Sequence, residues 1–152
     1  MQFVAHLYRG DHVAAVFMCQ NDPGECGEWD PWLGANRARL FAASGLAPLP
    51  VPEDGNTLLA ATTALTPFCW DSAGYEDIDP GTWGTVLGRL GGAPRWLQAD
   101  QTPDCPGCGV VMGLVAQFEC GRSLAEGPFF GGGCAYLFAC VPCSEAVYLW
   151  QC

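Results

Sequence analysis

Short apolar segments separated by turn-forming residues run along the chain and predict β-hairpins. Near the N-terminus, residues 3–7 and 12–19 are apolar and flank the tetrapeptide Tyr8-Arg9-Gly10-Asp11. A Gly-Asp pair between two such segments is typical of a two-residue hairpin turn. Residues 110–118 and 134–139 form a second pair of apolar segments. We therefore expect a mainly β fold, a β-rich α+β arrangement of hairpin-based sheets.

The two apolar pairs also resemble each other in sequence. Residues 112–118 align with residues 1–7 and share Met, Val and Ala at matched places, and residues 134–140 align with residues 13–19 and share Ala, Phe and Cys. Similarity that recurs in the same order indicates an internal repeat. The alternative is two hairpins of similar composition. We expect duplication.

The length and the turn residues set the domain organisation. A chain of 152 residues is one domain or two small lobes. We expect a single domain over residues 1–152, with a first repeat lobe at about 1–50 and a second at about 85–152. The 20 glycines and 12 prolines favour turns and short strands. Residues 37–41 predict a strand with a charged face, and residues 79–90 predict a short helix with an apolar side.

The charge and the apolar runs bear on partners and location. The net charge is −10, with six arginines and no lysine, so the surface repels phosphate backbones and anionic membranes. A basic partner suits it, although a solubilising role explains the charge as well. The N-terminus does not read as a signal peptide, and the longest apolar runs are too short to cross a bilayer. We expect a cytoplasmic protein that binds neither nucleic acid nor membrane.

The strongest chemical signal is a pair of Cys-x-x-Cys motifs, Cys105-Pro-Gly-Cys108 and Cys140-Val-Pro-Cys143. One pair precedes the third apolar segment and the other ends the fourth, so an antiparallel hairpin brings all four thiols to its open end. Four thiolates complete a tetrahedral shell around Zn²⁺, which predicts a structural zinc-ribbon-like knuckle. An iron–sulfur centre uses the same ligands and stays open. A thioredoxin-like redox pair requires a βαβ context that neither motif has.

Six cysteines remain outside this predicted site. Cys134 lies within an apolar segment and is expected in the core. Cys19 is the repeat counterpart of Cys140, and the counterparts of Cys105 and Cys108 would precede Met1. We expect that the first repeat has lost its metal. The open alternatives are that Cys26 and another thiol complete a second site, or that the chain is a truncated form of a longer protein.

Several of these segments together resemble the YwqG-like family of bacterial proteins of unknown function, and more distantly the N-terminal region of programmed cell death protein 2. In the second half the resemblance rests on Leu90-Gly-Gly-Ala-Pro-Arg-Trp-Leu-Gln98, Cys105-Pro-Gly-Cys-Gly109, residues 112–118 and Gly131-Gly-Gly133 to Cys140. In the first half it rests on Val16-Phe-Met-Cys19, Trp29-Asp30 and Gly34-Ala-Asn36. The resemblance implies a duplicated β-rich domain. In the eukaryotic relatives it implies a chaperone-like role in holding a ribosomal protein, and in bacteria a role beside toxin systems.

The function that these features favour is protein binding. The sequence contains no nucleophile elbow, phosphate loop or zinc-protease motif, and we assign no catalytic residue. We expect a zinc-stabilised module, chaperone-like or immunity-related, that takes a basic or extended segment of a partner protein. Trp96 beside Arg95 is a candidate for its binding cleft. The alternative is a thiol-dependent hydrolase or redox enzyme that uses an unpaired cysteine such as Cys69 or Cys26.

Overall fold

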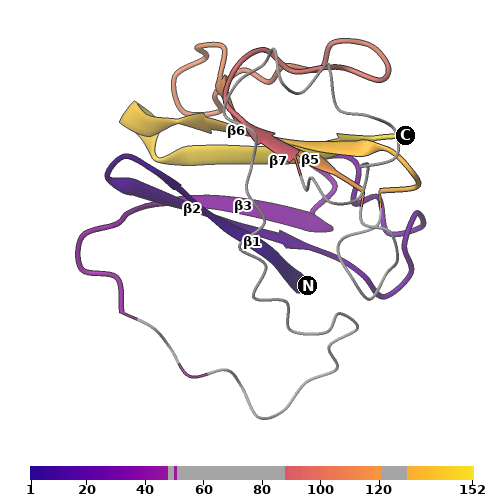
Figure 1. The fold of residues 1–152 in the computed structure, drawn as a ribbon, viewed down its shortest axis with the longest axis horizontal. Helices are drawn as coiled ribbons and strands as arrows, with labels where there is room; N and C mark the ends of the chain where they lie inside the picture. The colour runs from indigo at the N-terminus through magenta and orange to yellow at the C-terminus, as the bar shows by residue number, and fades with distance from the viewer. Residues whose placement is uncertain (48–49, 51–87, 121–129) are drawn as a thin grey trace.

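The protein is built from two antiparallel β-sheets that lie one above the other (Figure 1). The computed structural model describes residues 1–47, 50, 88–120 and 130–152. The first sheet has the order β1-β2-β3, and the second has the order β4-β5-β6-β7. The strands are β1 (Gln2–Arg9), β2 (His12–Met18), β3 (Asn36–Ala42), β4 (Gly88–Leu90), β5 (Gly113–Glu119), β6 (Cys134–Cys140) and β7 (Glu145–Gln151). The predicted mainly β fold is confirmed.

The hairpins β1-β2 and β5-β6 have the same pairing register. In the first, Phe3 pairs with Phe17 and Ala5 with Val16, with a bulge between the two pairs. In the second, Leu114 pairs with Phe138 and Ala116 with Leu137, again with a bulge between them. These positions are the ones that the sequence repeat aligns. The third strands, β3 and β7, pair with β2 and β6 in the corresponding register. The repeat is therefore present in the structure as well as in the sequence.

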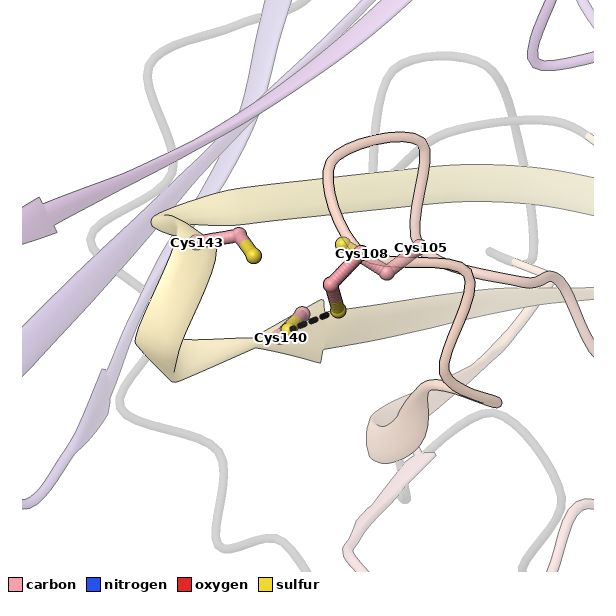
Figure 2. Close-up of side chains that lie close together, drawn as sticks. All are labelled: Cys105, Cys108, Cys140 and Cys143. Carbon is pink, nitrogen blue, oxygen red and sulfur yellow. Dashed lines mark hydrogen bonds between the residues drawn. The ribbon is translucent and has the colours of Figure 1, made fainter.

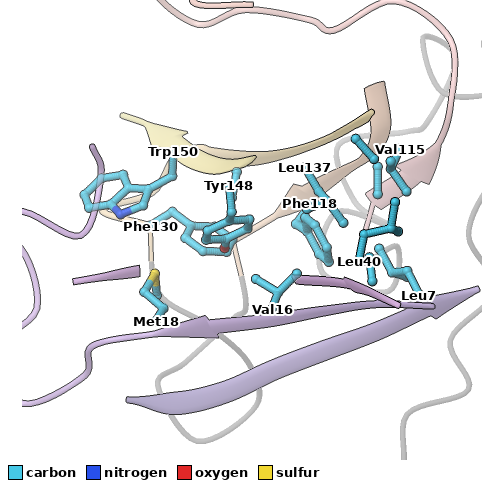
Figure 3. Packing of buried hydrophobic residues seen from close by; sticks show 14 residues of the cluster. Leu7, Val16, Met18, Leu40, Val115, Phe118, Phe130, Leu137, Tyr148 and Trp150 are labelled. Atoms are coloured by element: carbon cyan, nitrogen blue, oxygen red, sulfur yellow. The ribbon is translucent and has the colours of Figure 1, made fainter. Parts of the chain in front are cut away.

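The main core lies between the two sheets (Figure 3). Because directly paired residues share one face of a sheet, the alternation along each strand decides which side chains reach this core. From the first sheet come Leu7, Ala14, Val16, Met18 and Leu40, and from the second come Val115, Ala116, Phe118, Ala135, Leu137, Ala139, Tyr148 and Trp150, joined by Phe130. The repeat-equivalent positions of β2 and β6 thus face each other across one shared core.

The opposite, outer face of the second sheet is also buried. Tyr136, Phe138 and Leu149 on this face pack against Cys105 and Met112, with Trp96 partly buried against them. The ring of Trp96 lies tilted against the ring of Tyr136, with 4.4 Å between the ring centroids. It also stacks on the ring of Phe138, with 5.8 Å between the centroids. The Tyr136 hydroxyl donates a hydrogen bond to the carbonyl of Arg95. Residues 91–112, named here the covering segment, therefore close this face, and Trp96 is a packing residue of that cover.

The outer face of the first sheet is more open. Phe3, Tyr8 and Phe41 point to it, and 42%, 71% and 44% of their surfaces are exposed. Arg37 and Arg39 of β3 lie on the same face, across from Phe17 and Ala15 in register, and both are exposed. This aromatic and cationic face is the repeat equivalent of the face that the covering segment closes in the second sheet.

Two sequence predictions of local structure require correction. Residues 88–90 form strand β4 against β5, so the predicted helix over residues 79–90 is wrong at its C-terminal end, while residues 79–87 lie outside the described part of the chain. Strand β5 begins at Gly113, later than the predicted 110. The reason is that the chain from Asp104 to Val111 pairs with itself around the first Cys-x-x-Cys motif. Strand β7 was not predicted from the sequence. The boundaries of the two repeat lobes, at about 1–50 and about 85–152, stay predictions.

Candidate metal centre

The first Cys-x-x-Cys motif lies at the tip of a tight turn in the covering segment. An isolated bridge between Asp104 and Val111 closes this turn. Within it, the Cys105 N–H donates to the Val110 carbonyl at 2.9 Å, and the Gly109 N–H donates to the Cys105 carbonyl at 2.8 Å. These two hydrogen bonds hold the turn closed, and the thiols of Cys105 and Cys108 lie on the same side of it.

The second motif lies where β6 turns into β7. Cys140 is the last residue of β6, and a 3-10 helix (η2, Val141–Cys143) follows at once. Pro142 lies near the start of this helix, where the missing N–H of a proline has least effect. Ser144 then adopts the left-handed conformation, with φ of 54°, and donates its N–H to the Val141 carbonyl at 3.1 Å. The sharp reversal returns Cys143 to the side of Cys140.

The four thiols converge on one point (Figure 2). All four sulfur atoms lie within 4.8 Å of one another, and the Sγ atoms of Cys108 and Cys140 are 3.8 Å apart. Zn–S bonds of about 2.3 Å in a regular tetrahedron place sulfur atoms about 3.8 Å apart. One pair of sulfur atoms therefore has the separation of a tetrahedral thiolate site and all four are close to it, so the cluster can hold a metal ion. The structure brings together every cysteine of the predicted site.

Gly107 makes the approach of the two motifs possible. A Cβ atom at this position would lie 3.2 Å from both Cβ and Sγ of Cys143, and 3.7 Å from Sγ of Cys105. The first two distances are closer than side-chain carbons normally approach. Glycine in the first motif therefore lets the second motif close over it.

The environment of the cluster favours ionisation of one thiol in particular. Burial opposes ionisation of Cys105, but hydrogen bonds from the backbone N–H groups of Gly107 and Cys108 outweigh it, and the pKa of Cys105 falls from 9.0 to about 7. Hydrogen bonds with Cys108 and Cys105 raise the pKa of Cys143 to about 12. Such splitting is expected where several thiols share one site, because a first thiolate is stabilised by the thiols that remain protonated.

Two further cysteines that the structure describes have different surroundings. Cys134 is buried on the outer face of the second sheet, as predicted, and donates to the Glu119 carboxylate at 3.2 Å. Burial raises its pKa to about 12, so the thiol is a core residue. Cys120 accepts a hydrogen bond from the Phe130 N–H at 3.5 Å. Cys69, a candidate nucleophile in the enzyme alternative, lies outside the described residues.

Comparisons with protein-family models, with curated proteins and with solved structures found no match. The resemblance to YwqG-like proteins therefore stays a prediction. In the part of the chain that the structure describes, no helix has the length and apolar character needed to cross a membrane.

Proposed function

We propose that this protein is a non-catalytic module, stabilised by zinc, that binds an extended segment of another protein. The observation that carries the proposal is the difference between the two outer sheet faces. The second sheet has its outer face closed by the covering segment, with Trp96 on Tyr136 and Phe138. The equivalent face of the first sheet presents Phe3, Tyr8 and Phe41 partly exposed.

The second sheet provides a template for what the open face accepts. Phe17 occupies the repeat position of Phe138, on which Trp96 stacks. In the first sheet Phe17 contacts Phe3 edge to face at 5.8 Å. A partner segment that runs across the strands with an aromatic side chain over Phe17 would reproduce the packing of Trp96. Aromatic side chains are enriched at protein–protein interfaces because they contribute large contact areas.

Charge on the open face refines the expected partner. The net charge of −10 favours a basic partner at long range. On the face itself, however, the charged side chains are Arg37 and Arg39, and they replace the apolar Val147 and Leu149 of β7 in the corresponding register. Arginine pairs well with carboxylates. The segment that we propose is therefore extended and aromatic, and it places an acidic side chain opposite these arginines.

Zinc is the metal that the donor set favours, and its role is structural. Four thiolates suit Zn²⁺, and with all four bound no coordination position is left for water or substrate. The site fastens the covering segment, through Cys105 and Cys108, to the end of the β6-β7 hairpin, through Cys140 and Cys143. A reducing compartment such as the cytoplasm would keep the thiols available for the metal.

The thiol-dependent enzyme is the second candidate, and Cys26 is its described nucleophile. The hydrogen bond shared with Cys19, together with burial, raises the pKa of Cys26 above its ordinary value of 9.0. A catalytic cysteine, which must react rapidly near neutral pH at every turnover, needs the opposite shift of its pKa, because the thiolate is the reactive form. This observation favours the binding module over the enzyme. The resemblance to YwqG-like proteins, with its implied chaperone-like or immunity role, also supports binding.

The test is affinity capture from a native lysate, followed by identification of the captured protein and measurement of its dissociation constant. Tyr8→Ala and Arg39→Glu alter the open face at exposed positions, and Leu97→Ala alters an exposed apolar residue of the covering segment as a control. We expect one partner that the wild type and Leu97→Ala bind equally and that both face variants bind at least tenfold more weakly. Equal binding by all four proteins would refute the proposed face.

A further inference from the structure

Cys19 and Cys26 form a second pair of close thiols, separate from the four-cysteine cluster. Their Sγ atoms are 3.3 Å apart, in hydrogen-bond contact. Cys19 directly follows β2, and Cys26 lies in the connection between β2 and β3. Both side chains are partly buried. Among the described residues, no third cysteine, histidine or carboxylate completes a metal-binding group with them.

The repeat explains why two thiols meet at this place. Cys19 stands at the repeat position of Cys140, at the same end of the equivalent hairpin. After Cys140 the chain turns back within η2 and returns Cys143. After Cys19 the connection is longer, and a turn in which the Glu25 N–H donates to the Asp22 carbonyl at 3.1 Å returns Cys26. The end of the first hairpin therefore keeps a thiol pair where the second has a four-thiol cluster.

We propose that Cys19 and Cys26 form a reversible disulfide by exchange with a small-molecule disulfide such as oxidised glutathione. The Cys19 thiolate attacks the glutathione disulfide, which forms a mixed disulfide and releases one glutathione thiolate; Cys26 is the poorer first nucleophile, because its hydrogen bond with Cys19 and burial raise its pKa. The Cys26 thiol, which lies beside the mixed disulfide, then loses its proton and attacks the Cys19 sulfur, which releases the second glutathione thiolate. The two cysteine protons pass to the two glutathione thiolates, so the protein loses two electrons and two protons while glutathione gains them. The sulfur atoms must approach by about 1 Å to reach bonding distance, which side-chain rotation supplies.

The disulfide would brace the contact between the two sheets. Trp29 follows Cys26 in the same connection, and its carbonyl accepts a hydrogen bond from the Trp150 N–H of β7 at 3.3 Å. The two indole rings also meet edge to face at 6.2 Å. At the far end of the connection the Cys19 N–H donates to the Ala35 carbonyl at 2.7 Å. Oxidation would link Cys26, shortly before Trp29, to the end of β2. It would therefore restrict the motion of the β2-β3 connection where Trp29 contacts the second sheet.

Tryptic peptide mapping tests the disulfide directly. Cleavage after Arg9 and Arg37 releases residues 10–37, which contain Cys19 and Cys26 and no other cysteine. The zinc-loaded wild-type protein is incubated with oxidised glutathione, alkylated with iodoacetamide while native and again after unfolding, and digested. We expect the peptide without alkyl groups and two hydrogen atoms lighter than its reduced form, and we expect dithiothreitol to reverse the change.

Three results would overturn the proposal. One is a peptide that is doubly alkylated after oxidation. Another is a peptide joined to the one that contains Cys69, which would make Cys69 the partner. The third is loss of bound zinc in Cys19→Ser, which would make the pair metal ligands. Cys152→Ser, at an exposed position, is the matched control and should oxidise like the wild type. Because the main measurement uses wild-type protein and needs no binding partner, it remains decisive whatever the outcome of the capture experiment.

Discussion

Trp96 holds the covering segment on the second sheet, and its replacement by alanine tests the packing on which the candidate metal centre depends. The indole is half-buried and contacts two rings of β6, those of Tyr136 at 4.4 Å and Phe138 at 5.8 Å. Residues 105–108, which carry two of the four clustered thiols, belong to the same segment. Loss of the indole should therefore weaken both the fold and the metal site.

The expected loss of stability follows from burial. Replacing a buried tryptophan by alanine costs about 3–5 kcal/mol. Since Trp96 is half-buried, its cost lies at the lower end, about 3 kcal/mol, with the two aromatic contacts included. This corresponds to roughly a hundredfold change in the unfolding equilibrium constant. Zinc affinity should fall in the same variant, because ordering the covering segment then consumes part of the binding free energy.

Urea unfolding in excess zinc and reductant, followed by circular dichroism, measures the effect. Trp32→Ala is the matched control, since the same side chain is removed from a site where 64% of its surface is exposed. We expect the control to lie within about 0.5 kcal/mol of the wild type. If Trp96→Ala were as stable as Trp32→Ala, the covering segment would not depend on this packing, and the account of the outer face would be refuted.

Two further variants test the four-thiol cluster and one partly buried carboxylate. Gly107→Ala should lower zinc affinity at least tenfold in a chelator competition, because the new Cβ would lie 3.2 Å from Cβ and Sγ of Cys143. Gly113→Ala is the control and should bind zinc like the wild type, because the space around its new Cβ is open. Equal zinc affinities of the two variants would contradict the close approach of the two motifs. Burial raises the pKa of Glu119, which accepts a hydrogen bond from Cys134, above its ordinary 4.5. The folded state therefore favours the protonated acid, and stability falls as the pH rises through the folded-state pKa. Glu119→Gln should be more stable than the wild type near pH 7, with the difference vanishing near pH 4; a pH-independent difference in urea unfolding would contradict this assignment.

Local patterns predicted the hairpins and the thiol cluster well. Two apolar segments around Gly10-Asp11 can pair in few other ways, and Gly10 takes a left-handed φ of 56° in the turn. The hairpin then places the four-thiol cluster, because its open end brings together two motifs that are separated by 31 residues in the sequence. The repeat was visible as matched residues, and the structure adds a bulge at the same position in both hairpins.

Features that depend on distant packing were not predictable. Residues 88–90 continue an apolar spacing that suits a helix, yet they pair with β5, because a neighbouring strand edge outweighs local preference. Strand β7 carries apolar side chains on both faces, since one face meets the core between the sheets and the other meets the covering segment. It therefore lacks the alternation that marks a half-buried strand. The exposure of one outer face and the closure of its counterpart likewise follow from tertiary contacts.

The metal content of the purified protein tests the central claim most directly. Protein prepared under reducing conditions without chelator is analysed by elemental mass spectrometry, beside Cys108→Ser and the exposed-thiol control Cys152→Ser. We predict about one zinc per chain in the wild type and the control, clearly less in Cys108→Ser, and a loss of folded structure when a chelator removes the metal. Absence of zinc from the wild type, iron with visible colour, or full zinc content in Cys108→Ser would contradict a structural zinc held by these four cysteines.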